Sequence, residues 1–122
     1  MTDDTSPADF AAYLTKRGWK FTTRPLETNT AYVVEGYPVI QGKNTGKRVT
    51  IAFPIPNDYP RVPPTGPHLL KPHGLVGNFP AVNESKLGPQ WEYWSRKIEP
   101  WPEGRKNSRL YFDLVDRWLE GT

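Results

Sequence analysis

The feature that most constrains this chain is a proline-rich segment that follows an apolar run. Five of the 14 prolines fall within residues 56–68, in the stretch IPNDYPRVPPTGPHL that begins at Ile55. A proline fixes its φ angle and has no backbone N–H to donate, so this segment cannot continue as a strand inside a sheet. The run before it, residues 48–53, alternates as a half-buried strand does. The pattern therefore predicts a strand that ends here, closed by a rigid segment that offers no new edge for pairing.

A helix and two more strands are predicted before this segment. Residues 7–17 have a helical apolar stripe, with Ser6 as the cap, Pro7 in the first turn and Gly18 as the stop signal. Residues 19–24 and 31–40 are rich in β-branched and aromatic side chains. With residues 48–53 they form three strands of an antiparallel meander. The polar turn at residues 41–47 is predicted to be a solvated hairpin tip, and the basic residues in or beside it are Lys43, Lys47 and Arg48.

The second half of the chain is less regular. Residues 69–89 show no sustained period and are interrupted by Gly and Pro, which predicts a long ordered loop with room for one short strand. Residues 91–98 are ambiguous between a short strand and a helical turn. Ser108 is placed to cap a last helix with a broad apolar face, which Gly121 ends. The predicted fold is α+β, with three or four antiparallel strands and helices on one face, in a single domain of residues 1–122.

Composition restricts the chemistry of the chain. There is no cysteine, which excludes disulfides, thiolate metal sites and thioester catalysis for this sequence. The net charge of +3 permits an acidic partner without requiring one. No apolar run approaches the roughly 20 residues of a membrane span, and the acidic N-terminus is unlike a signal peptide. We therefore expect a cytoplasmic protein with no membrane contact.

The segment Tyr59-Pro-Arg-Val-Pro-Pro64 carries a family resemblance. A Tyr-Pro-x-x-Pro-Pro motif just after the third strand of a meander, behind an N-terminal helix, resembles the ubiquitin-conjugating enzyme-like (UBC-like) superfamily. That superfamily includes the catalytically inactive UEV variants and the RWD domains. The resemblance implies that the segment is a structural flap over the open end of the sheet, formed by Tyr59, Pro60, Pro63 and Pro64.

Beyond Pro64 the sequence departs from that pattern. The resemblance implies a His-Pro-Asn motif followed by a catalytic cysteine whose thiolate accepts the ubiquitin C-terminus. Here Pro72 precedes His73, no asparagine clearly matches the motif, and no cysteine follows. The chain is thus identified as a divergent prokaryotic-type member of the superfamily that lacks the catalytic cysteine.

Other residues could carry chemistry in this region. Ser85 and Ser95 lie where the cysteine would be sought, so either could be a weak nucleophile or a replacement for a natural cysteine. His68 and His73 lack the partners of a metal site, and no metal or other cofactor is expected. His73 is the better candidate for a general base, although a loop imidazole bonded to backbone is the simpler interpretation. Glu92 and the later glutamates show no arrangement that indicates hydrolase chemistry.

A basic and aromatic segment over residues 91–109 leaves two main functional hypotheses. The first is a non-catalytic conjugating-enzyme-like module that binds a ubiquitin-like protein or an activating enzyme in a bacterial-type conjugation system. The second is a nucleic-acid or adaptor module, because bases stack on rings while cations meet phosphates; the alternative for its tryptophans is a place in the core. A third hypothesis is an enzyme that uses His73. The predicted partner-binding residues are His73, Trp94, Ser95, Arg96, Lys97 and Trp101.

Overall fold

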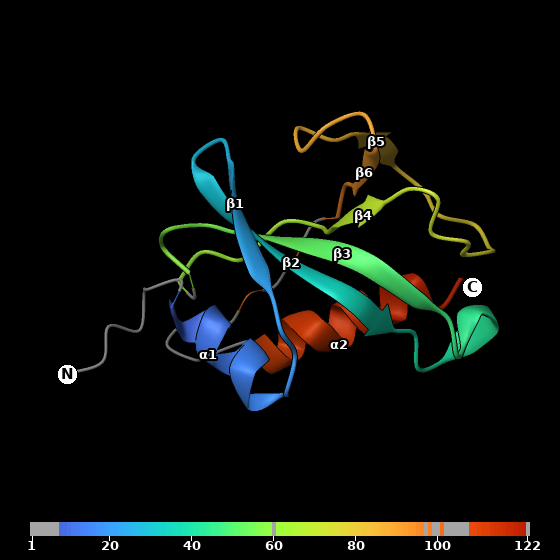
Figure 1. Ribbon diagram of the computed structural model, residues 1–122, viewed down its shortest axis with the longest axis horizontal. Coiled ribbons are helices and arrows are strands. Elements are labelled where there is room, and N and C mark those ends of the chain that lie inside the picture. Colours follow the sequence, from blue (N-terminus) through green and yellow to red (C-terminus); the bar gives the residue numbers. More distant parts are fainter. Residues whose placement is uncertain (1–7, 60, 97, 99–100, 102–107, 122) are drawn as a thin grey trace.

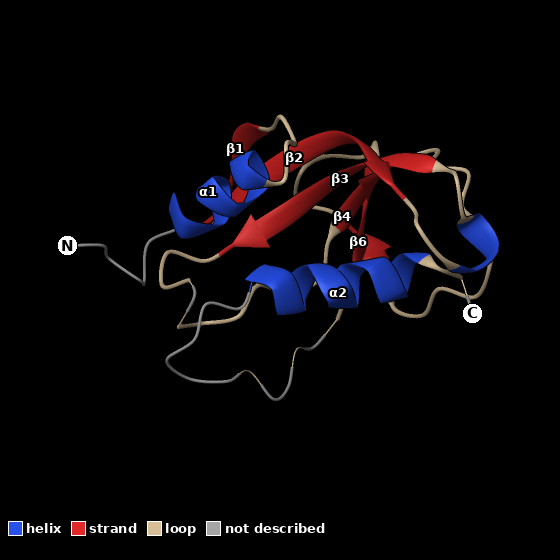
Figure 2. Cartoon of the chain, turned by 90° about the horizontal axis from the view of Figure 1, so that it is seen from below, coloured by secondary structure: helices blue, strands red, loops and turns tan. Residues whose placement is uncertain are grey.

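A computed structural model describes residues 8–59, 61–96, 98, 101 and 108–121. Two helices, α1 (Ala8–Lys16) and α2 (Ser108–Leu119), lie on the same side of one antiparallel sheet (Figures 1 and 2). The predicted α+β class, with an N-terminal helix, an antiparallel sheet and a C-terminal helix, is confirmed. The predicted cap Ser6 and first-turn Pro7 lie outside the described residues.

The sheet has six strands in the order β1-β2-β3-β4-β6-β5. They are β1 (Thr22–Leu26), β2 (Asn29–Pro38), β3 (Arg48–Ile55), β4 (His68–Leu70), β5 (Val82–Glu84) and β6 (Trp91–Trp94). The first three form the predicted meander, whereas the predicted total of three or four strands was too low. The last three strands are only three or four residues long, which is too short to show an alternating period.

An aromatic layer joins the sheet to both helices. The ring of Phe10 on α1 stacks on that of Phe112 on α2, with the ring centroids 5.4 Å apart. Phe53 on β3 meets Phe112 edge-on at 5.1 Å. All three side chains are at most 1% exposed. Such pairs contribute about 0.5–1.5 kcal/mol each beyond the area that they bury, so this layer fixes how the helices sit on the sheet.

The opposite face of the sheet is covered without a helix. Val33 and Ala52 are direct partners in the β2–β3 register, and both are buried beneath Leu87 from the turn between β5 and β6. A guanidinium nitrogen of Arg24 donates to the Leu87 carbonyl at 2.9 Å. The turn between β5 and β6 therefore folds back over the sheet and closes a second, smaller core.

The proline segment is attached to α2. Tyr59 is fully buried, and its hydroxyl forms a hydrogen bond with the hydroxyl of Ser108, the first residue of α2. The Tyr111 hydroxyl donates to the Thr65 carbonyl at 3.0 Å. Pro64 is buried as well, while Pro60 lies outside the described residues. These contacts hold the segment rigidly in place, and its function as a flap remains a prediction.

The hairpin between β2 and β3 is not simply a solvated tip. It contains a turn of 3-10 helix, η1 (Gly42–Asn44), and Asn44 is fully buried. The Asn44 amide accepts from the Val76 N–H at 2.8 Å and donates to the carbonyls of Val76 and Leu119 at 2.8 and 3.1 Å. Asn44 thus joins the hairpin, the end of α2 and the loop after β4. The expectation for the tip holds for Lys43 and Arg48, which are exposed.

Replacing Asn44 by alanine should lower the free energy of unfolding by about 3 kcal/mol. The substitution removes three hydrogen bonds and leaves their backbone partners poorly solvated, at roughly 1 kcal/mol each. Urea unfolding of N44A measures the loss. The matched control is Asn78→Ala, at an exposed position of the same loop, which should stay within about 0.5 kcal/mol. Equal effects of the two substitutions would contradict the role of Asn44.

Candidate functional site

The loop after β4 brings His73 against β6. Its Nδ1 accepts a hydrogen bond from the Leu75 backbone N–H at 3.1 Å, so Nε2 carries the ring proton. Nε2 then donates to Glu92 Oε2 at 3.0 Å. The expected bond between this imidazole and backbone is present. The contact between His73 and Glu92 was not predicted, because the two segments meet only after the sheet is formed.

Glu92 also binds a side chain of its own strand. Residues two apart on a strand face the same side, and the indole Nε1 of Trp94 donates to Glu92 Oε2 at 2.6 Å. The side chains of His73 and Glu92 are only 14% and 17% exposed, which shields these bonds from water. One carboxylate oxygen therefore joins β6 to the loop that follows β4.

Trp94 contacts both His73 and Glu92, and we call these three side chains, together with Phe79 and Arg96, the His73 cluster. The Trp94 ring stacks on Phe79 at 4.6 Å and meets the edge of His73 at 6.0 Å. The guanidinium of Arg96 lies 5.4 Å from the Trp94 ring centroid and donates to the Pro80 carbonyl at 2.7 Å. Partial burial lowers the pKa of Arg96 from its ordinary value. Trp94 is fully buried, whereas His73 and Arg96 are partly exposed and Ser95 is exposed.

Trp101 is the other predicted binding residue that the structure describes. Trp101 is half-buried, and its ring lies 6.4 Å from that of Tyr59, beside the proline segment. Lys97 lies outside the described residues. Trp91 is 7% exposed and packs on the opposite face of the sheet, under Arg24. Because Trp91 and Trp94 are both buried, on opposite faces, these two rings do not form the exposed platform on which nucleic-acid bases could stack.

A second imidazole is bonded to a serine. His68 Nδ1 lies 2.7 Å from Ser85 Oγ, which also accepts the Leu87 backbone N–H at 3.0 Å. The His68 ring stacks on Tyr93, with centroids 4.6 Å apart, and is 5% exposed. Burial lowers the pKa of His68 to about 4, so the ring is neutral near pH 7. Ser95, in contrast, is exposed, and its backbone N–H donates to the Ala81 carbonyl.

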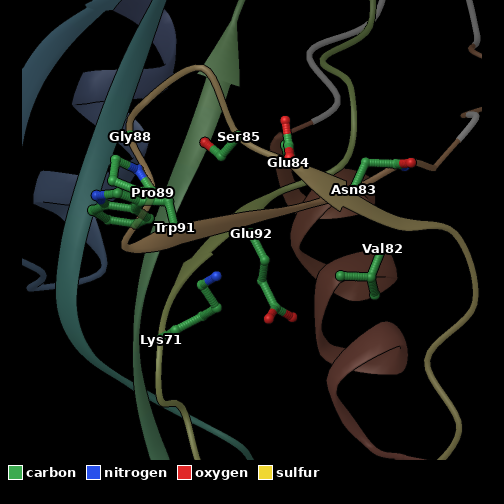
Figure 3. Close-up of a pocket in the computed structure, with 9 residues that line it drawn as sticks. All are labelled: Lys71, Val82, Asn83, Glu84, Ser85, Gly88, Pro89, Trp91 and Glu92. Atoms are coloured by element: carbon green, nitrogen blue, oxygen red, sulfur yellow. The ribbon is translucent and has the colours of Figure 1, made fainter.

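A shallow groove of about 770 Å³ lies beside these residues, along the β5–β6 hairpin (Figure 3). Lys71 and Glu92 project on one side of it, and Ser85 lies near the turn. Glu84 and Glu92 are direct partners in the β5–β6 register. Within the described residues, no group of three or more histidine and carboxylate side chains is arranged to hold a metal ion. The groove thus offers charged groups and one hydroxyl.

The fold and this region define a class of protein. An N-terminal helix, an antiparallel meander, a Tyr-Pro-x-x-Pro-Pro segment and a C-terminal helix on the same face make a UBC-like domain. Residues 6–122 match prokaryotic E2 family E, so the chain belongs to that family. No curated protein and no solved structure matches the sequence. Over the described residues, none of the helices has the length and apolar character to cross a membrane.

Sequence reasoning missed three residues that organise this region. Glu92, Phe79 and Asn44 all act across segments that are distant in the chain. The one local signal was the Glu92-x-Trp94 spacing, which places both side chains on one face if residues 91–94 are a strand. The asparagine carried no signal, because a polar residue in a Gly-bearing turn ordinarily faces water.

The stability of the protein should decrease as the pH falls from about 6.5 to about 4. The pKa of His68 is about 4 when folded and about 6.5 when unfolded, so the unfolded chain binds the extra proton. Above pH 6.5 the His68 imidazole is neutral in both states and does not reduce the free energy of unfolding. Between pH 6.5 and about 4, protonation of His68 in the unfolded chain lowers that free energy by up to about 3 kcal/mol. Urea unfolding at several pH values measures this. The variant His68→Gln should lose less stability over that interval; an unchanged pH dependence would contradict the assignment.

Replacing Glu92 by alanine should lower the free energy of unfolding by about 2 kcal/mol, because the buried Trp94 N–H loses its acceptor. The Trp94 indole signal in a ¹H–¹⁵N spectrum should move at the same time. Glu84→Ala, at the exposed position directly opposite, is the matched control and should change stability by less than about 0.5 kcal/mol. An indole signal that stays in place in E92A would show that this hydrogen bond is absent.

Proposed function

We propose that this protein is a non-catalytic conjugating-enzyme-like module that binds a ubiquitin-like protein or its activating enzyme in a bacterial-type conjugation system. The observation that carries the proposal is the family match over residues 6–122, in a chain that has no cysteine. A thioester forms on a thiolate, so this chain lacks the group that would accept the C-terminus of the ubiquitin-like protein. We further propose a bacterial, cytoplasmic protein, because the matched family is prokaryotic.

The geometry of the two serines supports a non-catalytic role. A serine hydroxyl attacks a carbonyl only when a neighbouring base removes its proton. The base beside Ser85 is His68, whose pKa of about 4 makes it a poor proton acceptor at neutral pH. Within the described residues, no imidazole is hydrogen-bonded to the Ser95 hydroxyl. Both nitrogens of His73 are engaged, by Leu75 and Glu92, which argues against His73 as a general base.

We place the partner surface around the exposed rim of the His73 cluster. Ser95 and Arg96 lie at its edge, and Trp94 supports them from below. Arg96 is a suitable anchor, because arginine combines a planar cation with an apolar stem and is enriched where proteins bind one another. Lys97 belongs to the same proposed surface from its sequence position alone, whereas Trp101 lies beside the proline segment and would be a separate contact.

A titration with a bacterial ubiquitin-like protein and with its activating enzyme tests the proposal. We expect saturable binding to one of them by isothermal titration calorimetry, retained at moderate salt. Single-stranded nucleic acid should not compete; binding to nucleic acid alone, with a steep loss on adding salt, would favour the nucleic-acid hypothesis instead. Arg96→Glu should weaken the affinity at least tenfold, whereas Arg109→Glu, at an exposed position on α2, should not.

A pair of cysteine variants tests the alternative that a natural cysteine has been replaced. Ser85→Cys and Ser95→Cys are each incubated with the activating enzyme, ATP and the ubiquitin-like protein. On our proposal neither variant forms an adduct that a thiol reductant removes. A reducible adduct on one variant and not the other would identify that serine as the position of an acyl acceptor, and would make an active conjugating enzyme the better account.

A further inference from the structure

A second groove lies toward the opposite end of the sheet, between the α1–β1 connection and the last part of β2. β1 pairs with β2 only as far as Thr22, which is opposite Val33. Residues 34–38 of β2 therefore have no partner in β1, although Val34, Tyr37 and Pro38 pair with β3 on the other side. A groove of about 560 Å³ runs along this stretch, within the range of ordinary ligand sites.

Two glycines in the lining of this groove leave backbone groups accessible to a ligand. Gly18 and Gly36 both have positive φ angles, and a Cβ added to either would meet no atom within 4 Å. The strand register shifts between Val34 and Tyr37, so only a short segment could pair there. Five residues of strand span roughly 16 Å. A few residues of an extended peptide are therefore the size of ligand that this edge could receive.

Positive charge surrounds the groove. Lys20 and Arg48 line it and are exposed, and the guanidinium of Arg48 donates to the Gly36 carbonyl at 3.0 Å. Lys16 and Arg17 lie just before it at the end of α1. The acidic residue that lines the groove is Glu35. Within the described part of the chain, Lys20, Arg48 and Glu35 take part in no ion pair.

The aromatic wall favours a peptide over a nucleic acid. Trp19 lines the groove, but its ring lies 4.8 Å from that of Tyr37 and carries the Arg17 guanidinium at 4.8 Å from its centroid. The Arg17 guanidinium already lies over the Trp19 ring, which disfavours the stacking of a base there. The indole edge and Phe21 instead offer an apolar wall for a side chain. A second copy of this basic surface would repel the first, so the complementary partner is acidic.

We propose that this groove binds an extended acidic segment of a partner protein, which lies along residues 34–38 of β2. Backbone groups of the segment pair with the open edge of β2, as in other cases of strand addition. Carboxylates of the segment meet Lys20 and Arg48, and an apolar side chain packs against Trp19. The groove is separate from the His73 cluster, so the proposal is independent of the function proposed above.

The test is an NMR titration of the whole protein with a blocked eight-residue peptide in which glutamate alternates with valine. We expect saturable shifts confined to the amides of residues 34–37, Lys20 and the Trp19 indole. The same peptide with lysine in place of glutamate should cause none. The double variant Lys20→Glu/Arg48→Glu should weaken binding at least tenfold. The control Lys43→Glu/Lys86→Glu reverses two exposed charges away from the groove and should bind within twofold of the parent protein.

Three results would overturn the proposal. They are shifts spread over all basic surfaces, equal loss of binding in both double variants, and the same amide shifts with a single-stranded oligonucleotide at equal affinity. Circular dichroism and thermal unfolding of each variant show whether it is folded. If the first double variant does not fold, the single variants Lys20→Ala and Arg48→Ala replace it, each with an expected loss of about threefold.

Discussion

The second half of this domain depends on the two hydrogen bonds that the carboxylate of Glu92 accepts. This carboxylate accepts hydrogen bonds from Trp94 on its own strand and from His73 on the loop after β4. Without this acceptor the buried indole N–H would be left unsatisfied, at a cost of about 1–3 kcal/mol, and the imidazole would lose the same partner. The shared oxygen holds β6 against that loop, and β6 in turn carries the edge strand β5 (Figure 1).

The two histidines of this UBC-like domain take part in hydrogen bonds within the fold. The chain belongs to prokaryotic E2 family E, yet the region that follows β4 uses its polar side chains to bond to one another. His73 has both ring nitrogens engaged, and His68 is buried, neutral and bonded to Ser85. Both histidines of the chain are thereby engaged in structural contacts. The function that we propose assigns partner recognition to this domain, with the proline segment and the His73 cluster as the proposed surfaces.

The sequence predicted the first half of the fold well, because its elements are long enough to show a period. Residues 7–17, 31–40 and 48–53 lie close to α1, β2 and β3, and the five prolines located the end of β3. The second half could not be predicted in the same way, because β4, β5 and β6 are set by pairing between distant segments. The Glu92–His73 contact and the burial of Asn44 arise only in three dimensions. Of the two interpretations of the basic aromatic segment, a place in the core is the one that holds for Trp91 and Trp94, which face opposite sides of the sheet.

The central claim is that this scaffold binds a conjugation partner without accepting the acyl group itself. Intact-mass spectrometry tests it most directly, after the protein is incubated with the activating enzyme, ATP and the ubiquitin-like protein and passed through a gel-filtration column without reductant. The account predicts that the chain elutes in a complex and retains its unmodified mass. A covalent adduct of the ubiquitin-like protein on this chain would contradict the account, and so would elution free of both partners.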